Sequence, residues 1–173
     1  MIVLGDDVRR SDKAEITQPE HFYIGNHVSI DMGVYISVRA DIGDYVHIAP
    51  HVCIIGGKDS FIYMGDFTNI SAGGKIIVAS DDFNNGMLNP IVPLEYRHLI
   101  GGETRMERFS CVGTNSVVLP NVNMAEGSIL GANSLLTKST IPWGIYVGSP
   151  AKLIKMREKK LVLNAYKELG YEY

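Results

Sequence analysis

The chain has 173 residues, with 16 Lys and Arg against 19 Asp and Glu and a formal net charge of −3. This length suits a single domain with a sizeable core, and the small acidic excess gives no electrostatic reason to expect nucleic acid or an anionic membrane as a partner. Charged residues come early, and no apolar run reaches the roughly 18 residues of a membrane span, so we expect a cytoplasmic protein without stable membrane insertion. Cys53 and Cys111 lack CxxC spacing and are expected to be small buried residues.

Residues 1–23 carry only a weak echo of the pattern that follows, at Leu4-Gly5 and Ile16. Terminal repeats of a solenoid are often atypical. We therefore predict an irregular first coil that caps the open end of a repeat array.

From residue 24 onward, isoleucine returns at every sixth position. The six members of this series are Ile24, Ile30, Ile36, Ile42, Ile48 and Ile54. A period of six fits neither a helix nor an alternating strand, but it is typical of a hexapeptide β-helix, in which short straight segments meet at corners. We predict an all-β solenoid with its coils over 24–76 and a four-residue insertion between Ile54 and Met64.

The repeat is absent from 77–99, where turn residues such as Asn85, Pro90 and Pro93 interrupt the pattern. A loop of this length inside a regular solenoid is usually functional or disordered. Its apolar residues, among them Phe83 and Ile91, predict a protruding loop that packs on a neighbouring subunit.

The repeat is predicted to resume with Ile100 and to continue over 100–152. Its expected anchors are Ile100, Met106, Val112, Val118, Met124, Leu130 and Leu136, with small residues four places after most of them. Over 153–173, apolar residues among Lys, Arg and Glu predict an amphipathic C-terminal helix that ends before Gly170.

Several segments, taken in this order, resemble the bacterial hexapeptide-repeat acyltransferases, and in particular the acetyltransferases of surface-polysaccharide and O-antigen biosynthesis. They are HIAPHVCIIGG (47–57), SDDF (80–83), NPIVP (89–93), VGTNSVVLPNV, LGANSLLTK and IPWGIYVGSPAKLIK (141–155). The resemblance implies a left-handed parallel β-helix, a homotrimer with active sites between neighbouring prisms, and acetyl-CoA along the seam. The expected acceptor is a sugar or nucleotide-sugar, and either O- or N-acetylation fits.

Acyl transfer from a thioester needs a group that removes a proton from the attacking alcohol or amine, and histidine suits this role. Many members of the family that this chain resembles carry a catalytic His in the protruding loop, but the comparable stretch of this chain, 80–83, has no His. His47 precedes an anchor and should point outward near the loop, so it is the first candidate. His51 and His98 are the alternatives.

The loop offers candidates for acceptor contacts. Asp82 is a candidate catalytic partner of the base, and Asp81, Asn84 and Tyr96 are candidate substrate-binding residues. The alternative for the two aspartates is a solvated Asx turn that opens the loop.

For the donor, Gly113, Gly131 and Ala132 leave room for close backbone approach. By resemblance, the end of the solenoid receives the nucleotide of CoA, with the GSPAK segment beside the adenine. The candidate cofactor-binding residues there are Lys138, Pro150, Lys152 and Lys155. The alternative is a solvated basic helix.

We therefore predict an acetyl-CoA-dependent acyltransferase that needs no metal and works by direct attack. One alternative is a γ-carbonic-anhydrase-like zinc enzyme, suggested by Arg39-Ala40-Asp41, but three convergent His ligands are not evident in the spacing. The other is a non-catalytic β-helix scaffold, against which the GSPAK run and the basic end speak.

Overall fold

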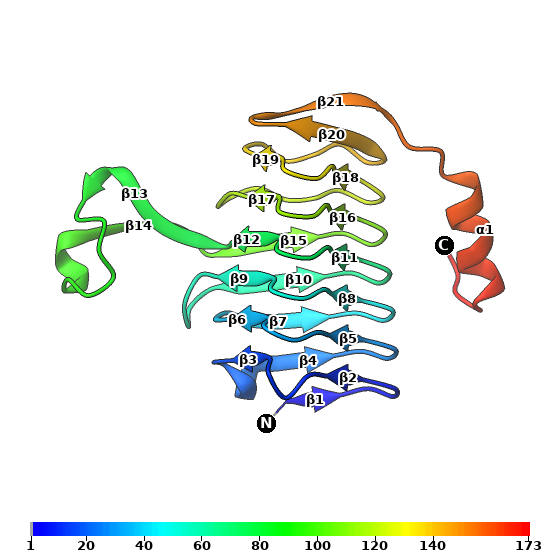
Figure 1. The fold of residues 1–173 in the computed structure, drawn as a ribbon, viewed down its shortest axis with the longest axis horizontal. Helices are drawn as coiled ribbons and strands as arrows, with labels where there is room; N and C mark the ends of the chain where they lie inside the picture. Colours follow the sequence, from blue (N-terminus) through cyan, green and yellow to red (C-terminus); the bar gives the residue numbers. More distant parts are fainter. Residues whose placement is uncertain (1) are drawn as a thin grey trace.

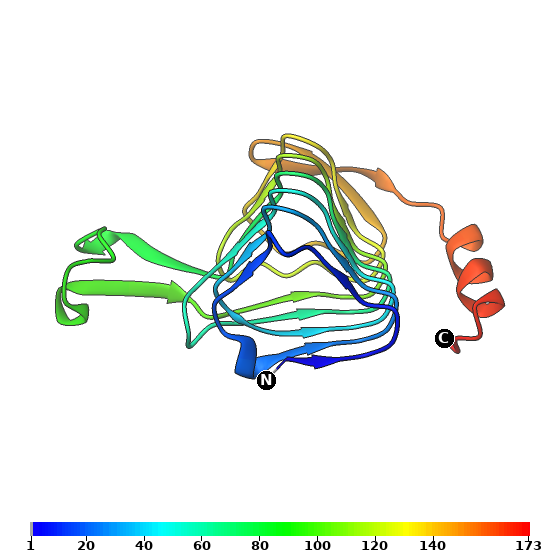
Figure 2. The same cartoon turned by 60° about the horizontal axis from the view of Figure 1, so that its bottom comes forward.

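The computed structural model describes residues 2–173, which form a triangular prism of stacked coils (Figures 1 and 2). Each of the first five coils contributes one short strand to each of three sheets, and within the described residues the later coils have no strand in sheet A. Sheet A contains β1 (Val3–Leu4), β4 (Phe22–Ile24), β7 (Arg39–Ile42), β10 (Phe61–Met64) and β15 (Glu103–Met106). Sheet B contains β2 (Arg9–Arg10), β5 (Ser29–Ile30), β8 (His47–Ile48), β11 (Asn69–Ile70), β16 (Cys111–Val112), β18 (Ile129–Leu130), β20 (Gly144–Gly148) and β21 (Ala151–Met156). Sheet C contains β3 (Glu15–Ile16), β6 (Tyr35–Ile36), β9 (Cys53–Ile55), β12 (Lys75–Ile77), β17 (Val117–Val118) and β19 (Leu135–Leu136).

The six-residue repeat forms the core of the prism. Strand pairing keeps the anchors in register from coil to coil, as in Ile24 opposite Ile42, Ile42 opposite Met64, and Met64 opposite Met106. Every predicted anchor from Ile24 to Leu136 except Ile100 is at most 1% exposed. The small residues at Ser110, Ser116, Ser128 and their equivalents are buried beside them. The predicted solenoid is therefore confirmed.

The predicted loop over 77–99 is an antiparallel β-hairpin. It consists of β13 (Ala79–Gly86), a short 3-10 helix (Leu94–Tyr96) and β14 (Arg97–Gly101), and it projects from the corner between sheets C and A (Figure 2). Ile100 is not an anchor, contrary to the prediction, because it pairs with Ser80 in this hairpin and is 36% exposed. The solenoid resumes within β15, where Thr104 and Met106 are buried.

The two ends of the chain also differ from the prediction. The first coil is regular, since β1, β2 and β3 pair in parallel with β4, β5 and β6, and a short 3-10 helix (Pro19–His21) follows it. Residues 151–156 are a strand because they pair with β20 as a hairpin that closes the other end of the prism. The helix α1 is therefore shorter than predicted (Lys160–Glu168). Among residues 2–173, no helix has both the length and the apolar character needed to span a membrane.

A stack of rings lines the corner between sheets A and B, and we call it the aromatic column: Tyr45, Phe67, Phe109 and Trp143. Ring centroids of neighbours in this column lie 4.8 to 6.0 Å apart. All four residues have a positive φ, a conformation that costs free energy for a bulky residue and is repaid here by packing. Gly127 leaves room for the Trp143 ring, because a Cβ at position 127 would lie only 2.5 Å from that ring.

The helix α1 lies beside this corner of the prism (Figure 1), and its Tyr166 packs edge-on against Phe109 of the aromatic column. Beyond the helix, the Tyr171 hydroxyl donates to Asp44 Oδ2 at 2.7 Å. Burial acts to raise the pKa of Asp44, but hydrogen bonds from the Asn26 amide and Tyr171 outweigh it, so the pKa lies below its ordinary value. The C-terminal segment is thus held by both packing and a charge-assisted hydrogen bond.

Ile54 and Ile55 provide a matched test of the core. Ile54 is fully buried and Ile55 is 39% exposed on the same strand. We expect Ile54→Ala to lower the free energy of unfolding by about 2–5 kcal/mol, because it leaves a cavity between stacked coils. Ile55→Ala should lower the free energy of unfolding much less, because its side chain is partly exposed. Urea unfolding followed by circular dichroism at one protein concentration measures both, and equal losses would contradict this account of the core.

Candidate active site

His47 lies on the outer face of sheet B. Side chains alternate along β8, so Ile48 enters the core and His47 points outward, with half of its side chain exposed. The parallel register aligns His47 with Ser29 on the coil before it and with Asn69 on the coil after it. Sequence spacing predicted this outward position.

Both ring nitrogens of His47 have partners. Nε2 lies 2.9 Å from Asp31 Oδ2, and Nδ1 lies 3.1 Å from Asn69 Oδ1. The Asn69 amide nitrogen donates in turn to Ser71 Oγ at 3.0 Å. A carboxylate on one imidazole nitrogen fixes the orientation of the ring and favours a proton on that side. The partner of Nδ1 is an amide oxygen, which also accepts, so a free lone pair on Nδ1 requires that this contact be exchanged.

Asp31 was not among the predicted site residues. It directly follows the anchor Ile30, whereas His47 directly precedes the anchor Ile48 on the next coil. In register, these positions are diagonal neighbours on one face of the sheet. The sequence spacing between Asp31 and His47 could therefore have predicted their contact, but only if the number of residues in the coil had been known.

A groove of about 390 Å³ opens beside His47, toward the N-terminal coils. We call it the His47 groove, and it is lined by Arg9, His27, Ser29, Asp31, Tyr45, Val46 and His47. His27 Nδ1 lies 3.1 Å from Asp7 Oδ2, and the His27 ring packs on Tyr45. The groove therefore joins an oriented imidazole to a wall that carries cationic and aromatic side chains.

The two alternative candidates, His51 and His98, lie apart from His47 in the fold. His51 occupies the corner between sheets B and C with a φ of 61°, and its ring covers Gly33, where a Cβ would lie 2.4 Å from Nδ1. His98 is an exposed residue of β14 on the hairpin. Within one chain, neither histidine shares the groove.

The hairpin aspartates have local partners. Asp81 Oδ1 accepts from Arg97 Nε at 2.8 Å, and both side chains are largely buried. Asp82 forms the Asx turn that was the alternative interpretation, since its carboxylate accepts from the Asn84 backbone amide and from Asn85 Nδ2. The Asn84 hydrogen bond holds the pKa of Asp82 below its ordinary value.

Within one chain, the hairpin residues of the predicted site lie apart from His47. The hairpin leaves the prism at the corner between sheets C and A, away from the face that carries His47 (Figure 2). Asp31 rather than Asp82 is therefore the carboxylate that orients His47 within a chain. The predicted substrate residues Asn84 and Tyr96 are exposed on the same hairpin.

The predicted donor residues divide into two groups. Gly113 is required by the coils themselves, since a Cβ there would lie 2.6 Å from the Ala132 amide nitrogen. A Cβ at Gly131 would instead lie 2.7 Å from the side chain of Val147. Ala132 is exposed at the corner between sheets B and C, and Pro150 is exposed in the turn between β20 and β21. Lys138, Lys152 and Lys155 are exposed in the last coils of the prism.

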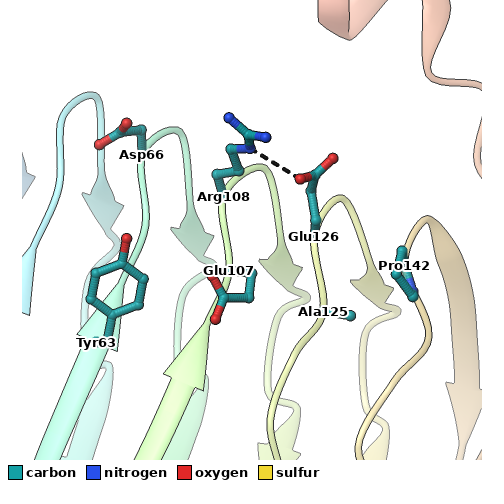
Figure 3. Close-up of a pocket in the computed structure, with 7 residues that line it drawn as sticks. All are labelled: Tyr63, Asp66, Glu107, Arg108, Ala125, Glu126 and Pro142. Carbon is teal, nitrogen blue, oxygen red and sulfur yellow. Dashed lines mark hydrogen bonds and ion pairs between the residues drawn. The ribbon is translucent and has the colours of Figure 1, made fainter. Parts of the chain in front are cut away.

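A second groove, of about 540 Å³, lies near the corner between sheets A and B (Figure 3). It is lined by Tyr63, Asp66, Glu107, Arg108, Ala125, Glu126 and Pro142. Arg108 Nε donates to Glu126 Oε2 at 3.0 Å, and the adjacent Arg105 pairs with Glu107 at 3.0 Å. Its cations are thus already neutralised, and none of the predicted site residues lines it.

Within residues 2–173, no three His, Cys, Asp or Glu side chains converge in a way that could hold a metal ion. The zinc-enzyme alternative required such a cluster of histidines. In this chain, His47 and His51 are separated by a corner of the prism.

No protein-family model matches the chain. It is 37% identical over 164 residues to a dTDP-4-amino-4,6-dideoxy-D-glucose acyltransferase of Escherichia coli, a match that covers 92% of this chain and 84% of that protein. AntD, an N-acyltransferase from Bacillus cereus solved with dTDP and 3-hydroxybutyryl-CoA, superposes with a TM-score of 0.91 at 37% identity, covering 97% of this chain and 89% of AntD.

The fold also extends to a more distant structure. A hexapeptide-repeat acetyltransferase from Vibrio cholerae superposes with a TM-score of 0.59 at 18% identity, covering 90% of this chain and 74% of the other. The chain therefore belongs to the bacterial hexapeptide-repeat acyltransferases with the left-handed β-helix fold, within the group that modifies sugars.

Proposed function

We propose that the chain transfers an acyl group from acyl-CoA to the amino group of a dTDP-linked 4-amino-4,6-dideoxy sugar, in the biosynthesis of a surface polysaccharide. The supporting observation is that the E. coli relative and AntD match nearly the whole chain and concern the same kind of acceptor. AntD is described as an N-acyltransferase, which favours nitrogen over oxygen as the attacking atom. We expect acetyl-CoA as the donor, and longer acyl-CoA thioesters are the alternative.

In the proposed mechanism, the neutral amine of the acceptor attacks the thioester carbonyl carbon directly. A carbon–nitrogen bond forms and the carbon–sulfur bond breaks, while the amine gives up a proton and the CoA sulfur leaves as a thiolate and then gains one. His47 is proposed as the base that takes the proton through Nδ1, after the acceptor displaces the Asn69 amide. Asp31 positions the ring and stabilises the imidazolium that results.

The AntD structures suggest two further side chains that contact the acceptor. They include variants at one serine and at one aspartate that lie ten positions apart in AntD. Ser71 and Asp81 are the one serine–aspartate pair with this spacing in the present chain. Ser71 joins the hydrogen-bond chain from His47 through Asn69, and Asp81 is the largely buried carboxylate of the hairpin. We propose that both contact the acceptor amine.

A homotrimer would bring these groups together. The hairpin exposes large apolar side chains, with Phe83 83% and Ile91 88% accessible in the single chain. Apolar surface of this kind is usually buried in an interface. We propose that the hairpin of one subunit covers the His47 face of the next, so that Asp81, Asp82, Asn84 and Tyr96 reach an acceptor bound beside His47. CoA is proposed to lie along the seam toward Lys138, Lys152 and Lys155.

The acceptor specificity can be tested directly. Incubation of the protein with acetyl-CoA and dTDP-4-amino-4,6-dideoxyglucose should release free thiol and yield an N-acetylated nucleotide sugar, detected by mass spectrometry. The matched control is dTDP-6-deoxyglucose, which has a hydroxyl in place of the amine. Acylation of the hydroxyl compound at the same rate would contradict the proposal of nitrogen as the attacking atom.

For the base, we expect His47→Ala to lower kcat about 10²- to 10⁴-fold while the KM for acyl-CoA and the melting temperature stay nearly unchanged. Asp31→Asn should lower kcat by a smaller factor, because the ring remains but loses its charged partner. His51→Ala and His98→Ala are the controls. Loss of activity in His98→Ala alone would assign the base to the hairpin, and normal rates in all three histidine variants would favour a carboxylate or a water relay.

For the assembly, light scattering at micromolar concentration should give about three times the 19.0 kDa chain mass. Phe83→Ser combined with Ile91→Ser should weaken the trimer and lower activity together, because both remove apolar area from the proposed interface. Leu161→Ser, on the far helix, removes a comparably exposed side chain as a control. A stable, active monomer would contradict the shared site.

A further inference from the structure

Arg9 lies on the same outward column of sheet B as His47. It pairs in register with Ser29 of β5, which pairs in turn with His47 of β8 (Figure 1). Neighbouring strands are spaced about 4.8 Å apart, so the backbones of Arg9 and His47 are separated by roughly 10 Å. The small Ser29 side chain lies between them and leaves the His47 groove open.

Arg9 contributes an uncompensated positive charge to this groove. Its side chain is exposed, and across residues 2–173 its guanidinium makes no ion pair. The two carboxylates nearby are already engaged, because Asp7 pairs with His27 at 3.1 Å and Asp31 with His47 at 2.9 Å. Arg108, which lines the groove of Figure 3, differs in this respect, since it is held by Glu126.

We propose that Arg9 binds the diphosphate of the acceptor, an inference that rests on the proposed function. The proposed amine position at Nδ1 is on the Asn69 side of His47, one coil further from Arg9, so the hexose ring spans His47 and the extended Arg9 side chain covers the remaining distance. The diphosphate then reaches the guanidinium, whose planar donors match phosphate oxygens in a two-pronged geometry. The acceptor thus lies along the coil axis, with its sugar on the third coil and its phosphates toward the first.

The position of this site separates it from the phosphates of CoA. Arg9 belongs to β2 in the first coil, whereas Lys152 and Lys155 belong to β21 at the opposite end of the prism (Figure 1). Acceptor and donor would therefore approach His47 from opposite ends. Their phosphates would be bound by different cations, which allows each contact to be removed alone.

Isothermal titration calorimetry with dTDP itself tests the proposal. We expect Arg9→Gln to weaken dTDP binding about 10- to 100-fold, as for the loss of charge-assisted hydrogen bonds, and to reduce its dependence on salt. The affinity for CoA should not change, which also reports that the variant is folded. Lys167→Gln, which removes an equal charge from an exposed position on α1, is the control and should bind dTDP normally.

Two different failures can be told apart. If the unmodified protein binds dTDP and Arg9→Gln binds it equally well, Arg9 is not the diphosphate ligand, and the proposed function stands. If the unmodified protein does not bind dTDP but still acylates a free amino sugar, the nucleotide-sugar acceptor is wrong, and the role of Arg9 is wrong with it.

Discussion

The structure depends on the stacking of aliphatic anchors in register from one coil to the next. Each parallel strand donates to and accepts from the coils on either side, so a coil that differed in length within a sheet would lose hydrogen bonds and move its anchor out of the core. Extra residues are therefore accommodated only at corners. The insertion before Met64 and the hairpin of β13 and β14 both leave the prism at such positions.

The same register positions the candidate site. Because each outward side chain lies above its counterpart on the preceding coil, residues far apart in the sequence form vertical columns at fixed spacing. Arg9, Ser29, His47 and Asn69 share one such column, and Asp31 and Ser71 lie in the column beside it. A rigid sheet thus fixes the spacing of the backbones that carry the oriented imidazole and the free guanidinium.

The segments that do not follow the six-residue repeat are attached at the corners of the prism. At one corner the aromatic column binds α1, and the C-terminal segment adds hydrogen bonds to Asp44 and to Glu126. At another corner the hairpin extends into solvent and keeps Phe83 and Ile91 exposed in the single chain. The first corner is completed within the chain, whereas the second presents apolar surface that a further subunit can bury.

The sequence by itself determined the fold, because a six-residue period in large aliphatic residues can be buried by only one kind of backbone path. It also placed His47 on an outer face, since a residue next to an anchor must point away from the core. It misplaced Ile100 and the start of the helix, because apolar residues that pair in a hairpin look the same as anchors or helix positions. It missed the regularity of the first coil because Arg10, a charged residue, takes the register position opposite the anchor Ile30. Only the tertiary structure showed that Asp31 is the carboxylate beside His47 within a chain. It likewise showed that the stacked backbones require glycine at 113 and that Arg9 lies in the same column as His47, since these contacts depend on how one coil lies on the next.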